Sequence, residues 1–165
     1  YSIKDKLGTL KNKKVLIIGD IKHSRVALSN IFCLKKMGAK VRVCGPSTLL
    51  PRFLTSLDVE VSYDLQESIK WCDVANILRI QLERQKLNFF PSNREYAMLF
   101  GLNKDVLKNI NNDILLMHPG PINRGVEVTT DVIDSNHSIV LDQVENGVAI
   151  RMAVLYLLAA KLKKK

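Results

Sequence analysis

Residues 75–84 read Ala75-Asn76-Ile77-Leu78-Arg79-Ile80-Gln81-Leu82-Glu83-Arg84, and this segment sets the interpretation of the whole chain. Its first half is almost continuously apolar, which is typical of a parallel strand covered on both faces. Charged and amide side chains follow, where such a strand ends. Because ligands in open α/β sheets bind beside the carboxyl ends of the strands, the segment predicts a buried strand that leads into a ligand site.

The polar side chains after this strand suit the binding of a carboxylate. The planar guanidinium of Arg79 can hold a carboxylate through two parallel hydrogen bonds. Gln81 points to the same side of an extended chain and offers both a donor and an acceptor. Glu83 can brace the guanidinium of Arg79 or of Arg84. Taken alone, the same residues also fit a solvated loop, in which charged side chains are common.

Strands and helices alternate along the rest of the chain. Apolar runs predict strands at 15–20, 41–45, 59–61 and 114–117, with 59–61 at an edge of the sheet. Helices are predicted at 22–37, about 47–57, 65–71, from 92, at 103–109 and at 144–162, with a helical turn within 127–134. This alternation favours a single α/β domain: a doubly wound parallel sheet in a Rossmann-like three-layer sandwich.

Two of these helices have apolar stripes that we expect to face the sheet. In the helix at 22–37 the stripe consists of Val26, Ile31, Leu34 and Met37. In the closing helix the inward residues are expected to be Val148, Met152, Leu155, Leu158 and Ala159. Asp64 is the expected N-cap of the helix at 65–71.

Composition narrows the class of protein. The chain has 165 residues and 47% hydrophobic residues, enough for one domain with a proper core. We expect no membrane span, because no apolar run reaches the ~18–20 residues that one requires. Cys33, Cys44 and Cys72 show no CxxC spacing, so they are interpreted as reduced thiols of a cytoplasmic protein. Tyr1 in place of Met leads us to expect a piece of a longer or processed protein.

The net charge of +9 allows two interpretations. Nucleic-acid binding is disfavoured, because the lysines are scattered and no basic patch is interleaved with aromatic residues. The alternative is a positive field that draws in small anionic substrates.

A second candidate site segment is Gly19-Asp20-Ile21-Lys22-His23-Ser24-Arg25, where a strand runs into a helix N-terminus. Such a junction can bind an anion. A nicotinamide dinucleotide is not expected, since the G-x-G-x-x-G pattern is missing and no acidic residue ends the next strand. Arg25 opposes the helix dipole in the first turn, which suggests that it serves a ligand. A solvated arginine is the alternative.

The third segment is His118-Pro119-Gly120-Pro121. Its prolines remove backbone donors and leave carbonyls that can accept hydrogen bonds from an amine or amide; a cis bond before Pro121 is one option. His118 is interpreted as structural in preference to catalytic, and Arg124 as a further anion contact. No metal-ligand cluster or nucleophile arrangement is evident. The three strand ends together predict a pocket for a small dicarboxylate that carries an amine.

Four segments carry a resemblance to a known family. They are 19–26 (GDIKHSRV), 78–84 (LRIQLER), 117–125 (MHPGPINRG) and 143–153 (QVENGVAIRMA). In this order they resemble aspartate carbamoyltransferases, specifically the C-terminal, aspartate-binding domain, from about Tyr1 to Ala160. The sister family that acts on ornithine has Cys after the equivalent of His118. Pro119 stands here instead, which favours aspartate.

The resemblance implies a reaction and a set of roles. The amine of L-aspartate attacks carbamoyl phosphate, giving N-carbamoyl-L-aspartate and phosphate for pyrimidine synthesis, with no metal or organic cofactor. Residues that bind substrate are implied to be Arg25, Arg79, Gln81 and the carbonyls of Pro119 and Gly120. Supporting residues are implied to be Lys22, Glu83, Arg84, His118, Pro121 and Arg124. Glu83 would brace Arg79, and Arg84 would link to the other domain.

The family's carbamoyl-phosphate half carries the motifs S-T-R-T-R and H-P-x-Q, and neither occurs in this chain. We therefore expect the N-terminal carbamoyl-phosphate domain to be absent from this chain, with no catalytic residue in residues 1–165 and no turnover by this half alone. The family pattern also implies a homotrimer of the full enzyme, with regulatory chains or a dihydroorotase as further partners. A carbamoyltransferase-like binding module without activity is the alternative function.

Overall fold

The computed structural model describes residues 1–81, 92–108, 110 and 113–162. A five-stranded sheet forms the centre, with the order β3-β2-β1-β4-β5 and every neighbouring pair parallel. The strands are β1 (Lys14–Ile18), β2 (Lys40–Cys44), β3 (Glu60–Ser62), β4 (Val74–Ile77) and β5 (Leu115–Met117). The α/β parallel sheet predicted from the sequence is confirmed, and β3 lies at an edge as expected.

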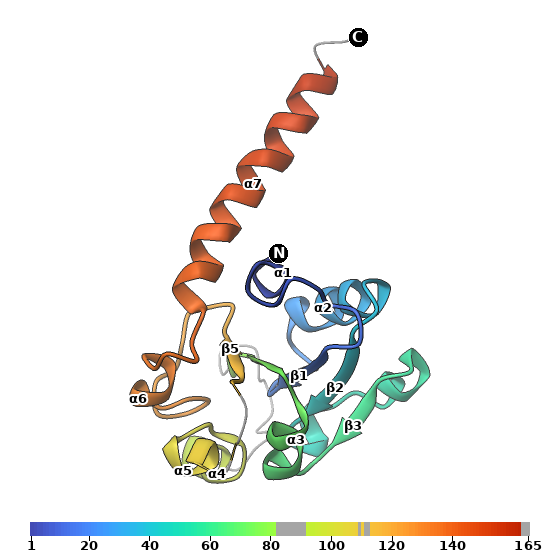
Figure 1. The fold of residues 1–165 in the computed structure, drawn as a ribbon. Helices are drawn as coiled ribbons and strands as arrows, with labels where there is room; N and C mark the ends of the chain where they lie inside the picture. Colours follow the sequence, from blue (N-terminus) through green and yellow to red (C-terminus); the bar gives the residue numbers. More distant parts are fainter. Residues whose placement is uncertain (82–91, 109, 111–112, 163–165) are drawn as a thin grey trace.

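Helices cover both faces of this sheet (Figure 1). The α-helices are α1 (Ser2–Leu7), α2 (Arg25–Lys36), α3 (Leu65–Trp71), α4 (Asn93–Phe100), α5 (Lys104–Lys108), α6 (Thr130–Ile133) and α7 (Val140–Leu162). Two short 3₁₀ helices, η1 (Ser47–Leu49) and η2 (Arg52–Leu57), replace the single helix predicted at 47–57. Pro51 lies between them, and a proline favours an extended residue before it, which interrupts a helix.

Alternate residues of β1 belong to two separate hydrophobic cores. Leu16 and Ile18 pack with residues of α3, α4 and α5, whereas Val15 and Ile17 pack with residues of α1 and α2. All four side chains are fully buried. Successive side chains of a strand point to opposite faces, so an unbroken apolar run marks a strand that is covered on both sides.

The start of α2 differs from the prediction by three residues. Ser24 is the N-cap, and its Oγ accepts a hydrogen bond from the backbone N–H of Ala27 at 3.2 Å. A serine in this position satisfies a free amide of the first turn, so the helix begins at Arg25 and not at Lys22. The predicted inward stripe is partly wrong as well, because Val26 and Met37 are exposed whereas Ala27, Ile31 and Leu34 are buried. The N-cap predicted at Asp64 is confirmed.

Helix α7 projects away from the sheet (Figure 1). It begins at Val140, four residues before the predicted start, and the expectation that its apolar residues face the core is wrong. The residues predicted to face inward are all exposed: Val148, Met152, Leu155, Leu158 and Ala159. The base of the helix is anchored by Asn146 Nδ2 to Ser2 Oγ (3.1 Å), by Asp142 to Lys6 (3.2 Å) and by Gln143 Oε1, which accepts the backbone N–H of His118 (3.2 Å).

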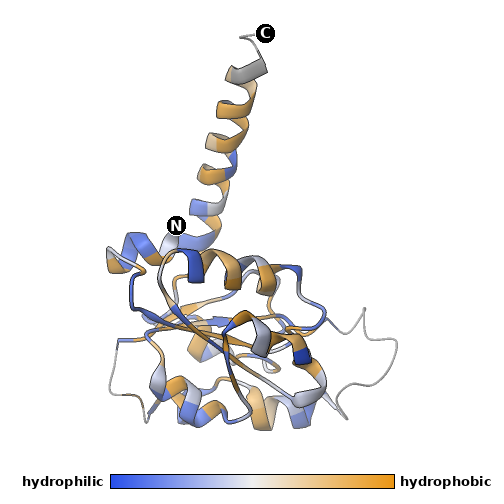
Figure 2. Cartoon of the chain, turned by 90° about the vertical axis from the view of Figure 1, so that its right-hand side faces the viewer, coloured by the Kyte–Doolittle hydropathy of each residue, from blue (hydrophilic) through white to orange (hydrophobic). Residues whose placement is uncertain are grey.

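Figure 2 shows that α7 is apolar over most of its length. Between Arg151 and Lys161 it has no charged residue. Despite this, none of the described helices is both long and apolar enough to cross a membrane. A helix that is apolar on every side is normally buried against other protein, and α7 lacks such cover among the described residues.

Candidate functional site

The chain reverses its direction across the sheet between β1 and β4. From β1 it proceeds outward through β2 to β3, then returns to β4 on the other side of β1 and continues to β5. The segments that follow β1, β4 and β5 are the three sequence-predicted site segments. They therefore meet at the carboxyl edge of three adjacent strands, at the topological switch point where α/β sheets bind ligands.

Gly19 allows the ends of β1 and β4 to approach each other closely. Its φ is +117°, and a Cβ on it would lie 3.1 Å from both the carbonyl oxygen of Leu78 and the hydroxyl oxygen of Tyr96. Both the backbone angle and the space favour glycine over any other residue. The strand pairing continues beyond β4, since Leu78 N donates to Ile18 O at 2.8 Å.

A buried carboxylate shapes the turn between β1 and α2. Asp20 is fully buried, and its Oδ1 accepts a hydrogen bond from the backbone N–H of His23 at 3.1 Å. Nδ1 of His23 lies 2.8 Å and 3.0 Å from the two carboxylate oxygens. Arg25 follows this turn as the first residue of α2, and Lys22 lies within the turn. Both side chains are exposed. Asp20 and His23 had no role in the sequence prediction, although their i, i+3 spacing is a usable signal.

The end of β4 alternates between buried and half-buried residues. Leu78 and Ile80 are buried, whereas Arg79 and Gln81 are half-buried and follow the alternation of an extended chain. Arg79 and Gln81 thus share one side, as predicted. Within the described part of the chain, Gln81 Oε1 is buried and makes no hydrogen bond. The predicted roles of Glu83 and Arg84 lie outside the described residues.

The loop after β5 is held from beneath by His118. His118 is buried, its backbone N–H donates to Gln143 Oε1 at 3.2 Å, and its Nδ1 accepts from the backbone N–H of Gly120 at 2.9 Å. In the neutral ring the proton therefore resides on Nε2. Pro119, Gly120 and Pro121 are exposed, and the Gly120–Pro121 peptide is cis. This geometry agrees with a structural histidine.

Asn123 and Glu127, whose structural roles were not predicted from the sequence, connect this loop to the segment after β4. The backbone N–H of Asn123 donates to Glu127 Oε1 at 2.7 Å, and its Nδ2 donates to Ile80 O at 3.2 Å. Glu127 is 1% exposed, and its Oε1 lies 3.4 Å from Nε2 of His118. An acidic residue between Val126 and Val128 was the available signal, because buried carboxylates normally have a specific partner.

Arg124 lies beside this loop but is occupied by a carboxylate of its own chain. Its guanidinium donates to both oxygens of Asp134, at 3.0 Å and 3.1 Å, in an exposed pair. The neighbouring carboxylate raises the pKa of Arg124. The predicted contact of Arg124 with a substrate anion would require that this pair open.

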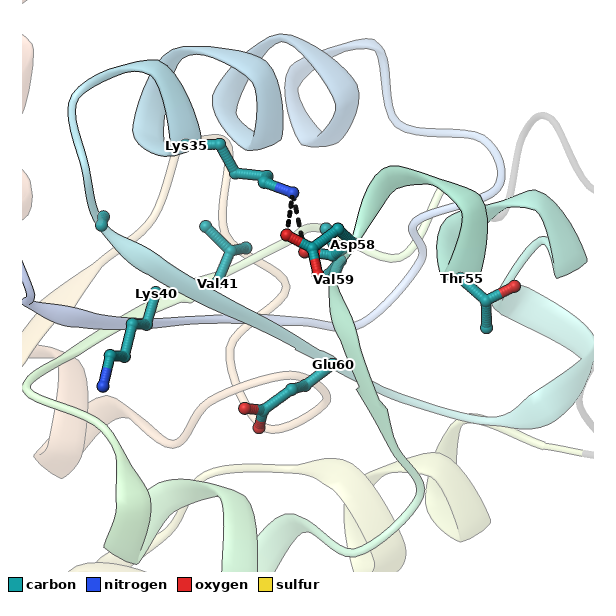
Figure 3. Close-up of a pocket in the computed structure, with 8 residues that line it drawn as sticks. Lys35, Lys40, Val41, Thr55, Asp58, Val59 and Glu60 are labelled. Carbon is teal, nitrogen blue, oxygen red and sulfur yellow. Dashed lines mark hydrogen bonds and ion pairs between the residues drawn. The ribbon is translucent and has the colours of Figure 1, made fainter.

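A separate hollow lies on the opposite edge of the sheet (Figure 3). It has a volume of about 370 Å³ and is lined by Lys40 and Glu60 at the amino ends of β2 and β3. Lys35 closes one side through hydrogen bonds to Asp58. It does not contain the predicted site residues. No group of three His, Cys, Asp or Glu suited to a metal ion occurs in the described segments.

Residues 11–158 match the family described as "Aspartate/ornithine carbamoyltransferase, Asp/Orn binding domain". The aspartate carbamoyltransferase catalytic subunit of Cytophaga hutchinsonii is 65% identical over 159 residues, which cover 96% of this chain and 52% of that protein. The catalytic subunit of Christiangramia forsetii is 62% identical over 164 residues, covering 99% and 53%. The chain spans about half the length of the curated relatives it matches.

Solved structures show the same fold. Ornithine carbamoyltransferase from Pyrococcus furiosus superimposes with a TM-score of 0.77 at 32% identity, covering 93% of this chain and 52% of that one. Aspartate transcarbamoylase from Trypanosoma cruzi in complex with N-(phosphonacetyl)-L-aspartic acid gives 0.76 at 22% identity, covering 94% and 52%.

Proposed function

We propose that this chain provides the aspartate-binding half of an aspartate carbamoyltransferase. The chain belongs to the aspartate/ornithine carbamoyltransferase family, through the Asp/Orn-binding domain of that family. The whole protein would transfer the carbamoyl group of carbamoyl phosphate to the amine of L-aspartate, for pyrimidine synthesis. Identities above 60% to catalytic subunits of aspartate carbamoyltransferases support aspartate over ornithine, as does Pro119 after His118.

The observation that carries this proposal is the position of Arg79 and Gln81 at the switch point, beside the Pro119–Gly120 loop on the neighbouring strand. Arg79 and Gln81 would hold the aspartate carboxylates, with Arg25 approaching from the start of α2. The carbonyls of Pro119 and Gly120 would accept hydrogen bonds from the carbamoyl and amino nitrogens. Lys22, Pro121 and Arg124 remain proposed supporting residues.

The chemistry of this half would consist of positioning and electrostatics. A nucleophilic amine and a carbamoyl carbon react faster when both are held in the attacking geometry, which converts a two-body encounter into a step within one complex. Arg79 and Arg25 would supply two fixed positive charges against the two aspartate carboxylates, and Gln81 would add a neutral hydrogen-bond donor, so no proton transfer is needed. The phosphate of carbamoyl phosphate would be bound by the other half.

Helix α7 supports a partnership with that other half. Its exposed apolar residues include Met152, Leu155 and Leu158, and a surface of this kind normally marks an interface. A hollow of about 560 Å³ continues from the base of α7 between α1 and α2. Ser2 contacts α7 at this base, so a half that precedes this segment in a longer protein would have its C-terminal end beside the apolar helix.

The family pattern further supports a homotrimer of the full enzyme, with regulatory chains or a dihydroorotase as partners in some assemblies. A cytoplasmic location suits the free thiols of Cys33, Cys44 and Cys72, because disulfides are rare in reducing compartments.

The test is to join this chain to the carbamoyl-phosphate-binding half that precedes it in the family pattern, here called the two-domain protein, and to assay carbamoyl aspartate. Arg79→Ala should abolish turnover at ordinary aspartate concentrations, because losing a paired charge grip weakens binding by on the order of 2–5 kcal/mol. Arg42→Ala is the matched control, since Arg42 pairs with Glu60 and Glu67 away from the site. A folded two-domain protein without turnover would favour the inactive binding module.

A further inference from the structure

We propose that Asn123 is a positioning residue that keeps the Pro119–Gly120 loop in register with Arg79 and Gln81. This inference rests on the function proposed above. The Arg79–Gln81 segment follows β4 and the Pro119–Gly120 loop follows β5. Asn123, together with Glu127, would keep the distance between these two segments fixed.

On the β4 side, Asn123 binds the backbone between the two predicted aspartate contacts. Its Nδ2 donates to the carbonyl oxygen of Ile80 at 3.2 Å, and Ile80 lies between Arg79 and Gln81. Ile80 itself is buried, at 4% exposure. A shift of Asn123 would therefore move the backbone that aims both side chains.

On the β5 side, the connection continues through two buried groups. The backbone N–H of Asn123 donates to Glu127 Oε1 at 2.7 Å, and the same oxygen lies 3.4 Å from Nε2 of His118. His118 Nδ1 accepts a hydrogen bond from the backbone N–H of Gly120 at 2.9 Å. The contacts thus run from Asn123 through Glu127 and His118 to the exposed loop. His118 and Glu127 are each 1% exposed. The two hydrogen bonds, Asn123 N–H to Glu127 and Gly120 N–H to His118, hold their backbones in place because water does not replace a hydrogen bond that is lost at a buried group.

The consequence is a fixed distance between the groups that would hold aspartate and the carbonyls that would hold its amine and the carbamoyl group. A misplacement of about 1 Å can lower a rate on the order of 100-fold. The network acts through backbone positions and touches neither substrate, so its loss should lower kcat more than it alters the binding of carbamoyl phosphate.

The experiment compares variants of the two-domain protein by kcat, by KM for each substrate and by thermal stability. Asn123→Ala removes only the link to Ile80, and we expect kcat to fall at least about 10-fold while KM for carbamoyl phosphate stays within about 2-fold. The matched control is Asn103→Ala, which removes the N-cap hydrogen bond to Val106 N in α5 and so loses stability away from the site. Equal kcat values for Asn123→Ala and Asn103→Ala would overturn the inference.

A conservative pair at Glu127 separates positioning from folding. Glu127→Gln keeps an oxygen at the Oε1 position and should retain most of the wild-type kcat, whereas Glu127→Met removes the acceptor and should behave like Asn123→Ala. If the two Glu127 variants have equal kcat values, the acceptor has no positioning role.

A readout without turnover separates this inference from the proposed function. In the two-domain protein labelled with ¹⁵N-glycine, Asn123→Ala should shift the amide resonance of Gly120, and Asn103→Ala should leave it in place. If the wild-type protein forms no carbamoyl aspartate, the proposed function has failed, yet the Gly120 resonance still decides whether the network exists. An unmoved resonance in Asn123→Ala would contradict the network.

Discussion

Nδ1 of His23 lies 2.8 Å from Oδ1 of Asp20, and the carboxylate of Asp20 is fully buried. The same carboxylate accepts the backbone N–H of His23, so one aspartate determines the shape of the turn that leads to Arg25. The pair therefore connects buried Asp20, after β1, to the position of Arg25, a predicted substrate contact.

Replacing Asp20 with alanine should therefore affect both stability and aspartate binding. Removing the Asp20 carboxylate leaves the part-buried backbone N–H of His23 without its acceptor, which lowers the free energy of unfolding by about 1–3 kcal/mol. In the two-domain protein KM for aspartate should rise as well, because Arg25 loses its fixed approach. Asp64→Ala is the control: it removes the exposed N-cap of α3, which contributes about 1 kcal/mol, and should leave KM unchanged. Urea unfolding and initial rates measure both effects. Unchanged aspartate kinetics in Asp20→Ala would contradict the link to Arg25.

Gln81→Glu tests the charge requirement of the site. A second carboxylate beside Arg79 would compete for its guanidinium and repel a carboxylate of aspartate. We expect KM for aspartate to rise at least about 10-fold, which corresponds to about 1.4 kcal/mol. The matched change Gln66→Glu on the exposed face of α3 should have no such effect. Steady-state kinetics at varied aspartate concentration provide the comparison, and equal KM values for the two variants would exclude Gln81 from the aspartate site.

The double variant Leu155→Glu/Leu158→Glu tests the apolar surface of α7. Both leucines are more than half exposed in this chain and would be buried by the other half. Burying a leucine contributes about 1.5–3 kcal/mol, and burying an unpaired carboxylate is unfavourable, so association of the separately produced halves should weaken by at least about 100-fold. Leu99→Glu, at an exposed leucine of α4, is the control. Sedimentation of the mixed halves measures the association, and full assembly of the double variant would show that α7 lies outside the interface.

Because two thiols are buried, the free energy of unfolding should fall as the pH rises above 9. Burial raises the pKa of Cys44 to about 11 and that of Cys72 to about 12, from an ordinary value of 9.0. Above pH 9 the unfolded thiols ionise while the folded ones stay protonated, so the unfolded state binds fewer protons and stability falls as pH rises toward 11–12. The slope is about 1.4 kcal/mol per pH unit for each thiol, and the contribution is fully present below pH 9.

Urea unfolding at pH 8, 9 and 10 measures this slope, and Cys44→Ala should reduce it by the contribution of one thiol. Cys33 is exposed, so Cys33→Ala should leave the slope unchanged. A slope that is the same in wild type and Cys44→Ala would show that the Cys44 thiol does not carry the effect.

The strands, and the meeting of three polar segments at the carboxyl edge of the sheet, could be predicted because their signals are local. The apolar run before Arg79 identifies a strand, the alternation of strands and helices implies a parallel sheet, and a parallel sheet brings its carboxyl ends together. The α3 N-cap at Asp64 was found for the same reason, since a cap and its partner lie three residues apart.

Features that depend on distant partners could not be predicted in this way. The sequence predicts that Arg124 contacts a substrate anion, yet its guanidinium is paired with Asp134. The two residues are ten positions apart, and no local sequence pattern indicates that they pair. The bond from Asn123 to Ile80 joins residues of two different strand ends. The sequence predicts that the apolar residues of α7 face the domain core, which is wrong, because periodicity shows that a helix face is apolar but not which surface covers it.

The most direct test of the central claim is the ratio of kcat/KM for L-aspartate to that for L-ornithine, measured on one preparation of the two-domain protein with carbamoyl phosphate. If Arg79 and Gln81 bind a second carboxylate, aspartate should be preferred by a factor of at least about 10³, since ornithine would place an ammonium group against a guanidinium. Formation of carbamoyl aspartate with that preference is the expected result. Efficient formation of citrulline, or no turnover with either amino acid by a folded protein, would contradict the assignment of these residues to aspartate.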